Sequence, residues 1–88
     1  MLKIQKTAVR EVVVFTLSGR IKAEDVAELQ RLFEGVADSH RMVLDLKEVK
    51  LVDRETVKFL ARCEADGTTL ENCPAYIREW IVRERELT

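Results

Sequence analysis

Two segments within the first eighteen residues have side-chain patterns typical of β-strands. Within residues 2–7, Leu2 and Ile4 share one face and polar side chains share the other, which predicts a half-exposed strand at a sheet edge. Residues 11–18 are rich in β-branched and aromatic side chains, which predicts a more central strand that Gly19 ends. Because the connection between these segments is short, we expect an antiparallel hairpin.

From Ala23 onward the apolar positions change to the spacing of one helix face. We expect a helix that begins at Ala23, has acidic side chains in its first turn, and ends near Gly35 and residues 38–39. Its buried face is predicted to consist of Val26, Leu29, Leu32, Phe33 and Val36. Residues 42–46 are predicted to form a short apolar strand, and residues 47–52 a turn or a brief irregular extension.

A second helix is predicted to begin at Asp53, whose carboxylate can accept hydrogen bonds from the unpaired N–H groups of a first helical turn. The side chains expected on its inner half are Val57, Phe59, Leu60, Ala61, Cys63 and Glu64. Those expected on its wet face are Glu55, Lys58, Arg62 and Asp66. Gly67 fits the end of this helix.

A fourth strand and a third helix complete the pattern. Residues 68–72 predict the strand, and Pro74 opens the helix, because a first helical position needs no N–H. The side chains expected to be buried by this helix are Ile77, Trp80 and Ile81. Trp80 could instead be an exposed anchor in an interface. Residues 83–86 are predicted to be a solvated tail of mixed charge.

This succession of elements predicts an α/β fold in a single domain over residues 1–88. Its order is β-β-α-β-α-β-α, which corresponds to a small mixed four-stranded sheet packed with helices. Strands separated by a helix should be parallel, with right-handed crossovers, and the first hairpin should supply one antiparallel edge.

The composition argues against several classes of function. Fifteen Lys and Arg against sixteen Asp and Glu give a formal net charge of −1, which provides no attraction for nucleic acid or an anionic membrane. The longest apolar run, residues 12–15, is too short to insert into a bilayer, and no leader segment is visible, so we expect a cytoplasmic protein. With a single histidine, His40, and no glycine-rich phosphate motif, we expect no metal, no cofactor and no enzyme activity.

The two cysteines have ordinary and reactive interpretations. Cys63 is expected to behave as a small apolar core residue. Cys73 precedes Pro74 at a helix N-terminus, where a thiolate would be stabilised, so a reactive thiol is the alternative. A disulfide between them is conceivable but disfavoured in the cytoplasm.

Three strings of residues carry a family resemblance over nearly the whole chain. Residues 18–21 read Ser-Gly-Arg-Ile at the entry to the first helix, and residues 43–46 read Val-Leu-Asp-Leu, followed by Val49, Val52 and Asp53. Asn-Cys-Pro at residues 72–74 precedes the last helix. In this order and spacing they resemble the STAS domain, the fold of bacterial anti-sigma-factor antagonists. The resemblance implies a non-catalytic regulatory module that acts by protein–protein contact.

The chain departs from this family where its phosphorylation chemistry resides. Many members carry Ser-Ser-Gly after the aspartate, and a partner kinase phosphorylates a serine there; this chain has Asp53-Arg54-Glu55-Thr56. Matched residue by residue, Glu55 stands at the phosphoacceptor-equivalent position. Glutamate forms no stable phosphoester, but it supplies about one permanent negative charge where phosphoserine would supply about 1.5 to 2.

Three interpretations of Glu55 follow. The chain is locked in a state resembling the phosphorylated antagonist, or its surface has diverged towards another partner, or Glu55 is an ordinary first-turn acid. Whether Thr56 is itself phosphorylated stays open, although its hydroxyl fits a role in the helix cap better.

The expected contact surface is the N-terminus of the second helix with the adjoining loops. Its polar, outward-facing positions are Asp53, Arg54, Glu55, Thr56, Lys58, Arg20 and Lys22. The resemblance implies a kinase-like anti-sigma factor or a related regulatory ATPase as partner. One alternative is a STAS-like cytosolic subunit of a lipid-transport ATP-binding-cassette system. The other is a homodimeric structural module that pairs through the edge strand or the third helix.

Overall fold

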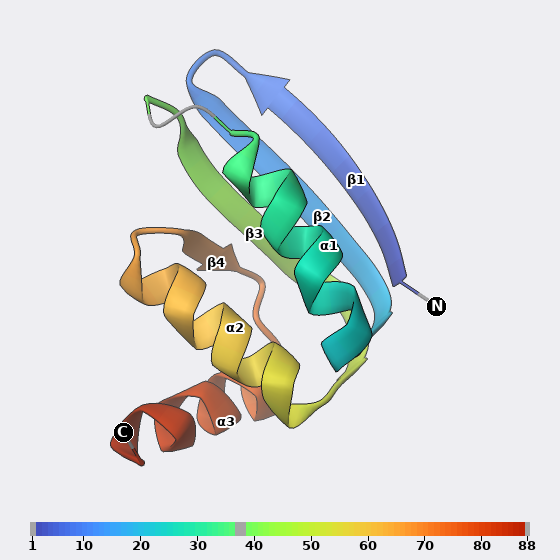
Figure 1. The fold of residues 1–88 in the computed structure, drawn as a ribbon, viewed down its shortest axis with the longest axis vertical. Coiled ribbons are helices and arrows are strands. Elements are labelled where there is room, and N and C mark those ends of the chain that lie inside the picture. Colours follow the sequence, from blue (N-terminus) through green and yellow to red (C-terminus); the bar gives the residue numbers. More distant parts are fainter. Residues whose placement is uncertain (1, 37–38, 88) are drawn as a thin grey trace.

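The computed structural model describes residues 2–36 and 39–87. Its elements are β1 (Leu2–Val9), β2 (Val12–Ile21), α1 (Ala23–Glu34), β3 (Arg41–Val52), α2 (Arg54–Ala65), β4 (Thr69–Glu71) and α3 (Ala75–Glu86). The sheet has the order β1-β2-β3-β4, with β1 antiparallel to β2 and the other neighbours parallel (Figure 1). The predicted element order and the mixed sheet with one antiparallel edge are therefore confirmed. Of the predicted end of the first helix, Asp38 lies outside the described residues.

The two central strands are longer than the side-chain pattern predicted. β2 continues through Gly19 to Ile21, and β3 continues through residues 47–52. The register between them shifts twice in this stretch, so the apolar alternation breaks while the strands stay paired. Gly19 supplies the positive φ of 92° that the irregular stretch uses. Gly19 therefore does not end the strand, and residues 47–52 are an irregular extension rather than a turn.

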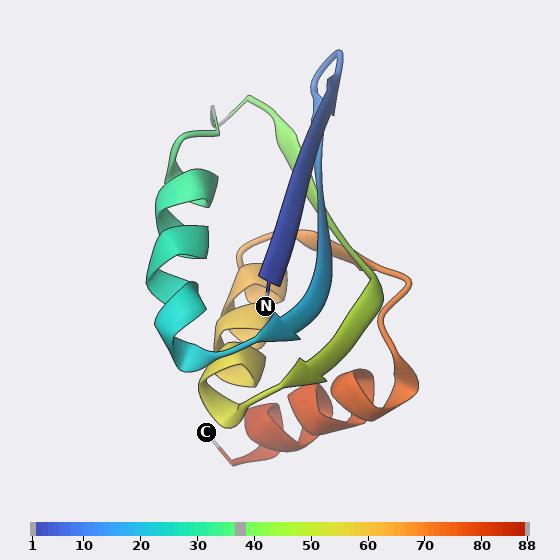
Figure 2. The same cartoon turned by 90° about the vertical axis from the view of Figure 1, so that its right-hand side faces the viewer.

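One continuous core lies between the sheet and the helices. Figure 2 shows α1 and α2 on the same side of the sheet and α3 across its lower end. The buried core side chains are Val13, Phe15, Leu17, Ile21, Leu29, Leu44, Leu46, Val49, Val52, Val57, Phe59, Leu60, Ile77 and Ile81. Phe33 connects α1 to this core, because its ring lies 4.9 Å from that of Phe15 and 5.6 Å from that of Phe59, centroid to centroid.

The predicted burial of two side chains is wrong. Leu32 is 40% exposed, because Phe33 rather than Leu32 fills the space between α1 and the core. Glu84, predicted to lie in a solvated tail, is only 7% exposed and contacts Arg54. Trp80 is half-buried, whereas Ile77 and Ile81 are fully buried as expected.

Candidate functional site

The N-terminal ends of α1 and α2 lie side by side at one end of the sheet (Figure 1). The strands that precede them run parallel and finish opposite each other, with Ile21 paired to Val52. Each helix begins within two residues of that pair. Because both helices start at the carboxyl ends of parallel strands, their positive ends converge at the edge where α/β folds most often place their sites.

A single carboxylate joins the two helix ends. Asp53 Oδ1 accepts hydrogen bonds from the Thr56 backbone N–H at 2.9 Å and from Thr56 Oγ1 at 2.8 Å. Asp53 Oδ2 accepts from the Ala23 backbone N–H at 2.7 Å. Desolvation acts to raise the pKa of Asp53, but the bonds from the Thr56 backbone and hydroxyl, from Ala23 and from its own backbone outweigh it and lower the pKa. The predicted N-cap is confirmed, and it also holds the neighbouring helix.

Thr56 belongs to the interior and not to the surface. Its side chain is fully buried, and Oγ1 lies 3.0 Å from the backbone oxygen of Ile21 as well as 2.8 Å from Asp53. One hydroxyl hydrogen is therefore shared between two acceptors. The prediction that Thr56 faces outward is wrong, whereas the role of its hydroxyl in the helix cap is confirmed. A buried hydroxyl is also a poor target for a kinase.

The N-terminal part of α2 carries three charged side chains at the surface, Arg54, Glu55 and the half-buried Lys58. Glu55 is 63% exposed and forms an ion pair with Lys58 at 3.6 Å. Arg54 is 61% exposed, and its Nε donates to Glu84 Oε1 at 3.1 Å, which connects this turn to α3. Positive and negative side chains therefore alternate at the surface, next to the part-buried hydrogen bonds between Asp53 and Thr56.

Two further predicted residues lie on the α1 side of Asp53. Arg20 and Lys22 line a hollow of about 450 Å³ together with Leu2, Ile4, Glu24, Asp25 and Glu28. The Lys22 backbone N–H donates to Asp25 Oδ2 at 2.9 Å, so the start of α1 has a cap of its own. Lys22 precedes Ala23, the residue that Asp53 binds, and this places the hollow next to the junction of the two helices.

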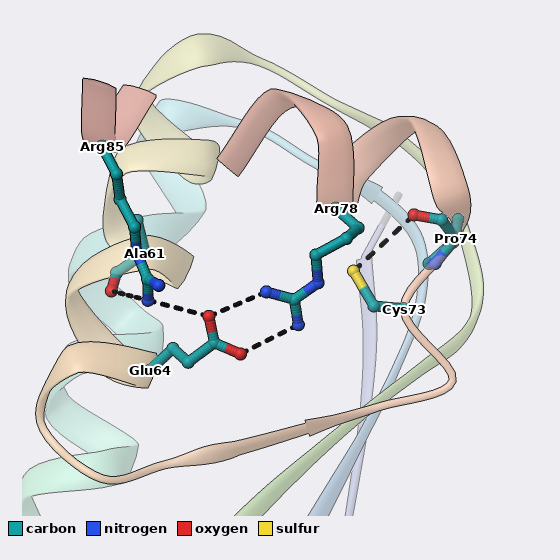
Figure 3. Close-up of polar contacts among 6 residues, drawn as sticks. All are labelled: Ala61, Glu64, Cys73, Pro74, Arg78 and Arg85. Atoms are coloured by element: carbon teal, nitrogen blue, oxygen red, sulfur yellow. Dashed lines mark hydrogen bonds and ion pairs between the residues drawn. The ribbon is translucent and has the colours of Figure 1, made fainter. Parts of the chain in front are cut away.

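A second polar junction, which the sequence pattern did not reveal, joins α2 to α3 (Figure 3). Both oxygens of Glu64 accept from Arg78, each at 2.8 Å, and Oε1 also accepts from Arg85 at 2.8 Å. The hydrogen bond from Arg78 is the largest influence on Glu64 and lowers its pKa against partial desolvation. The same bond raises the pKa of Arg78. No local signal could have identified this cluster, because its members come from two helices and form no short motif.

Neither cysteine has the environment of a reactive thiol. Burial raises the pKa of Cys63 to about 11, and it also raises the pKa of Cys73. The Cys73 Sγ lies 3.7 Å from the Pro74 backbone oxygen (Figure 3). Neither thiol forms a disulfide. The alternative of a stabilised Cys73 thiolate is not supported, because burial raises the pKa of Cys73 by more than the charge of Arg78 lowers it.

Within residues 2–36 and 39–87, no three His, Cys, Asp or Glu side chains gather closely enough to hold a metal ion. No helix there has the length and apolar character needed to cross a membrane.

Comparisons with known proteins point to one family. A family model described as "Mlab, STAS domain" matches residues 4–72. No curated protein sequence matches the chain. The structure of the anti-sigma factor antagonist SpoIIAA in its unphosphorylated form superposes with a TM-score of 0.64 at 22% identity, covering 88% of this chain and 79% of that one.

Two other solved structures share the fold. A STAS-domain antisigma-factor antagonist from Rhodobacter sphaeroides has a TM-score of 0.58 at 14% identity, over 78% of this chain and 82% of that one. A protein of the DUF3478 family with a SpoIIAA-like fold, from Shewanella loihica, has a TM-score of 0.59 at 13% identity, over 98% and 77%. At these identities the structures establish the fold of the chain.

Proposed function

The chain belongs to the STAS domain family, and from this premise we propose that it is a non-catalytic regulatory module that acts by protein–protein contact. The observation that carries the proposal is the first turn of α2. Exposed Arg54 and Glu55 and half-buried Lys58 stand on a base that Asp53 and Thr56 hold with part-buried hydrogen bonds. A partner would meet a rigid backbone with a defined pattern of charges, which favours specific recognition over raw affinity.

The partner we propose is a kinase-like anti-sigma factor in the cytoplasm. This proposal is supported by the likeness of the fold to two solved anti-sigma-factor antagonists. In it, Glu55 occupies the phosphoacceptor-equivalent position and fixes a negative charge there. Its carboxylate pairs with Lys58 at 3.6 Å but is largely exposed, so a partner can reach this charge.

A second candidate is a STAS-like cytosolic subunit of a lipid-transport ATP-binding-cassette system. The description of the matching family model names Mlab and not an anti-sigma-factor antagonist, and this favours keeping the candidate. The same turn of α2 would then face a transporter ATPase. Pairing of two copies through β1 is a weaker candidate, because its exposed edge carries Lys3 and Lys6, and charged edge strands resist pairing.

The test is an affinity pull-down from host lysate with mass spectrometry, comparing the wild type with Glu55→Lys. The matched control is Glu34→Lys, the same substitution at an exposed position at the opposite end of α1. Recovery of a kinase-like anti-sigma factor by the wild type and the control, but not by Glu55→Lys, would support the proposal. Recovery of transporter subunits would favour the second candidate. An identical set of partners in all three samples would contradict the proposed surface.

The locked-state hypothesis needs two further variants. If Glu55 imitates phosphoserine, Glu55→Ser and Glu55→Ala should both change the affinity for the recovered partner. Unchanged affinity in both variants would leave Glu55 an ordinary first-turn acid. A change in Glu55→Ser that an added phosphoryl group reverses would establish the equivalence directly.

A further inference from the structure

Helix α3 carries one fully buried apolar stripe and, beside it, a second one that is only partly covered, with Trp80 packed against the edge of the core. Ile77 and Ile81 lie fully buried in the core. On the neighbouring side of the helix, Tyr76 is 46% exposed, Trp80 is half-buried, and Leu87 is 72% exposed. Partly exposed aromatic and aliphatic side chains that gather on one side of a helix are candidates for an interaction surface.

The second stripe borders a hollow. This hollow, of about 370 Å³, is lined by Tyr76, Glu79, Trp80, Arg83, Glu84 and Leu87. Trp, Tyr and Arg are the side chains enriched at the energetic centres of interfaces. The helix also lies beyond residues 4–72, so the family match does not account for this surface.

We propose that two copies of this chain associate through α3, with the two helices antiparallel about a two-fold axis. The stripe of Tyr76, Trp80, Arg83 and Leu87 has the alternating spacing of four and three residues that forms a seam between helices. Centred on this stripe, a two-fold pair brings Tyr76 of one copy opposite Leu87 of the other, and Trp80 opposite Arg83.

Both of these juxtapositions are favourable. Leu87 is largely exposed at the C-terminal end of α3, and the second copy offers the hollow that Tyr76 and Trp80 help to line as the place to receive it. The Arg83 guanidinium would lie over the indole of Trp80, a cation–π contact. The surface is therefore self-complementary, as a two-fold interface requires.

The charges at the rim are self-complementary as well. Glu79 and Arg83 form an ion pair at 2.8 Å within the helix, and their side chains are 67% and 71% exposed. In the antiparallel pair, Arg83 of one copy also comes within reach of Glu79 of the other. Because the same pair of charges is present on each copy, a second copy of this chain provides the complementary charges. The contact of one helix with another is small, so the dimer is weak and transient.

The experiment measures the mass of the protein by sedimentation velocity between about 1 µM and about 1 mM, together with the emission of Trp80. Trp80 is the single tryptophan of the chain, so its emission reports directly on this surface. We expect the mass to rise towards that of a dimer and the emission to shift to shorter wavelength. Leu87→Ser should raise the dissociation constant at least about tenfold. Val82→Ser is the matched control, because Val82 is 45% exposed on the other side of α3.

A charge exchange tests the antiparallel geometry. Glu79→Arg and Arg83→Glu should each abolish self-association, because each variant places like charges face to face. Their mixture should recover it, because one helix is then basic and the other acidic at the rim. A monomer at every concentration, an equal loss in Val82→Ser, or a mixture that stays monomeric would overturn the proposal. The first of these results would assign the stripe to a different protein, and none of them bears on the proposed surface of α2.

Discussion

Helix α2 is held at its two ends by carboxylates that work in different ways. At its N-terminus, Asp53 accepts hydrogen bonds from two backbone N–H groups and one buried hydroxyl. In its last turns, Glu64 accepts three bonds from the guanidinium groups of two arginines on α3. The pKa of each carboxyl is lowered.

The difference lies in the donors. Backbone N–H groups at Asp53 are fixed by the helices themselves, so the geometry costs little additional order. The arginines at Glu64 are long side chains, 39% and 47% exposed, and must be ordered to make their bonds. The first junction is therefore a rigid part of the fold and a suitable base for a recognition surface. The second junction fastens the surface of α3, whose Ile77 and Ile81 also lie in the core.

The largest effect is expected at the first junction. Asp53→Ala removes the cap of α2 and the bond to Ala23 together, so it should lower the free energy of unfolding by about 2–3 kcal/mol. Asp53→Asn is the informative control, because its amide oxygen can still cap α2 while its NH₂ group cannot accept from Ala23. Urea denaturation measures the loss, and amide exchange should show the Ala23 N–H unprotected in Asp53→Asn while the Thr56 N–H stays protected. Equal protection of both would contradict the bridging role.

The second-largest effect on stability is expected at the buried hydroxyl of Thr56. Thr56→Val keeps the shape of the side chain but leaves the Ile21 carbonyl and Asp53 each without one donor, so a loss of about 1–2 kcal/mol is expected in urea denaturation. Thr56→Ser retains the hydroxyl and should recover most of that loss. If the serine variant proves as unstable as the valine variant, packing of the methyl group and not the hydrogen bond is responsible.

At the second junction a smaller effect is expected. Glu64→Gln removes the charge of the carboxylate, and the loss should be about 1 kcal/mol because the partners are partly exposed. The loss should shrink in high salt, since screening weakens exposed ion pairs. A salt-insensitive loss larger than that of Thr56→Val would reverse the ranking of the two junctions.

Acid should weaken both junctions. A carboxyl whose pKa is lower in the folded state than in the unfolded state stabilises the fold above the unfolded pKa, and this stabilisation is lost as the pH falls through the folded pKa. The wild type should therefore lose stability progressively below about pH 4. Asp53→Asn and Glu64→Gln should each show a flatter acid profile in thermal melts from pH 7 to pH 2.5. A profile parallel to that of the wild type would mean that the replaced group contributes no such dependence.

The smallest effect on stability is expected at Glu55. Its side chain is exposed and only its ion pair with Lys58 is lost, so Glu55→Ser should change the free energy of unfolding by less than about 0.5 kcal/mol. Chemical denaturation checks this, and it makes Glu55 variants valid probes of partner binding. A larger loss would mean that Glu55 serves the helix and that binding results with its variants need correction for folding.

Much of this architecture could be predicted from local patterns. The antiparallel hairpin, the parallel crossovers and the start of α2 at Asp53 depend on side chains close together in the sequence, where period and capping chemistry act directly. The extension of β2 through Gly19 could not be predicted in this way. A break in alternation has the same appearance in a sequence whether a strand ends or bulges.

For the residues of the candidate site too, local patterns predicted exposure correctly, and contacts with distant segments could not be predicted. Arg54 and Glu55 are exposed as predicted and Lys58 is half-buried, because all three lie on the polar side of an amphipathic helix. The outward-facing position predicted for Thr56 is wrong. Its hydroxyl donates to the backbone oxygen of Ile21, which lies 35 positions away in the sequence.

Local side-chain patterns were enough to predict the type and order of the elements and the start of α2, because the residues that set them are close together in the chain. The packing of distant segments is what makes Asp53 join two helix ends, buries Thr56 and brings two arginines to Glu64. Each of these depends on a partner brought from a distant segment, and hydrogen bonds and ion pairs act over a few ångströms. Their strength is therefore set by how the packed elements meet and not by the order of residues in the chain.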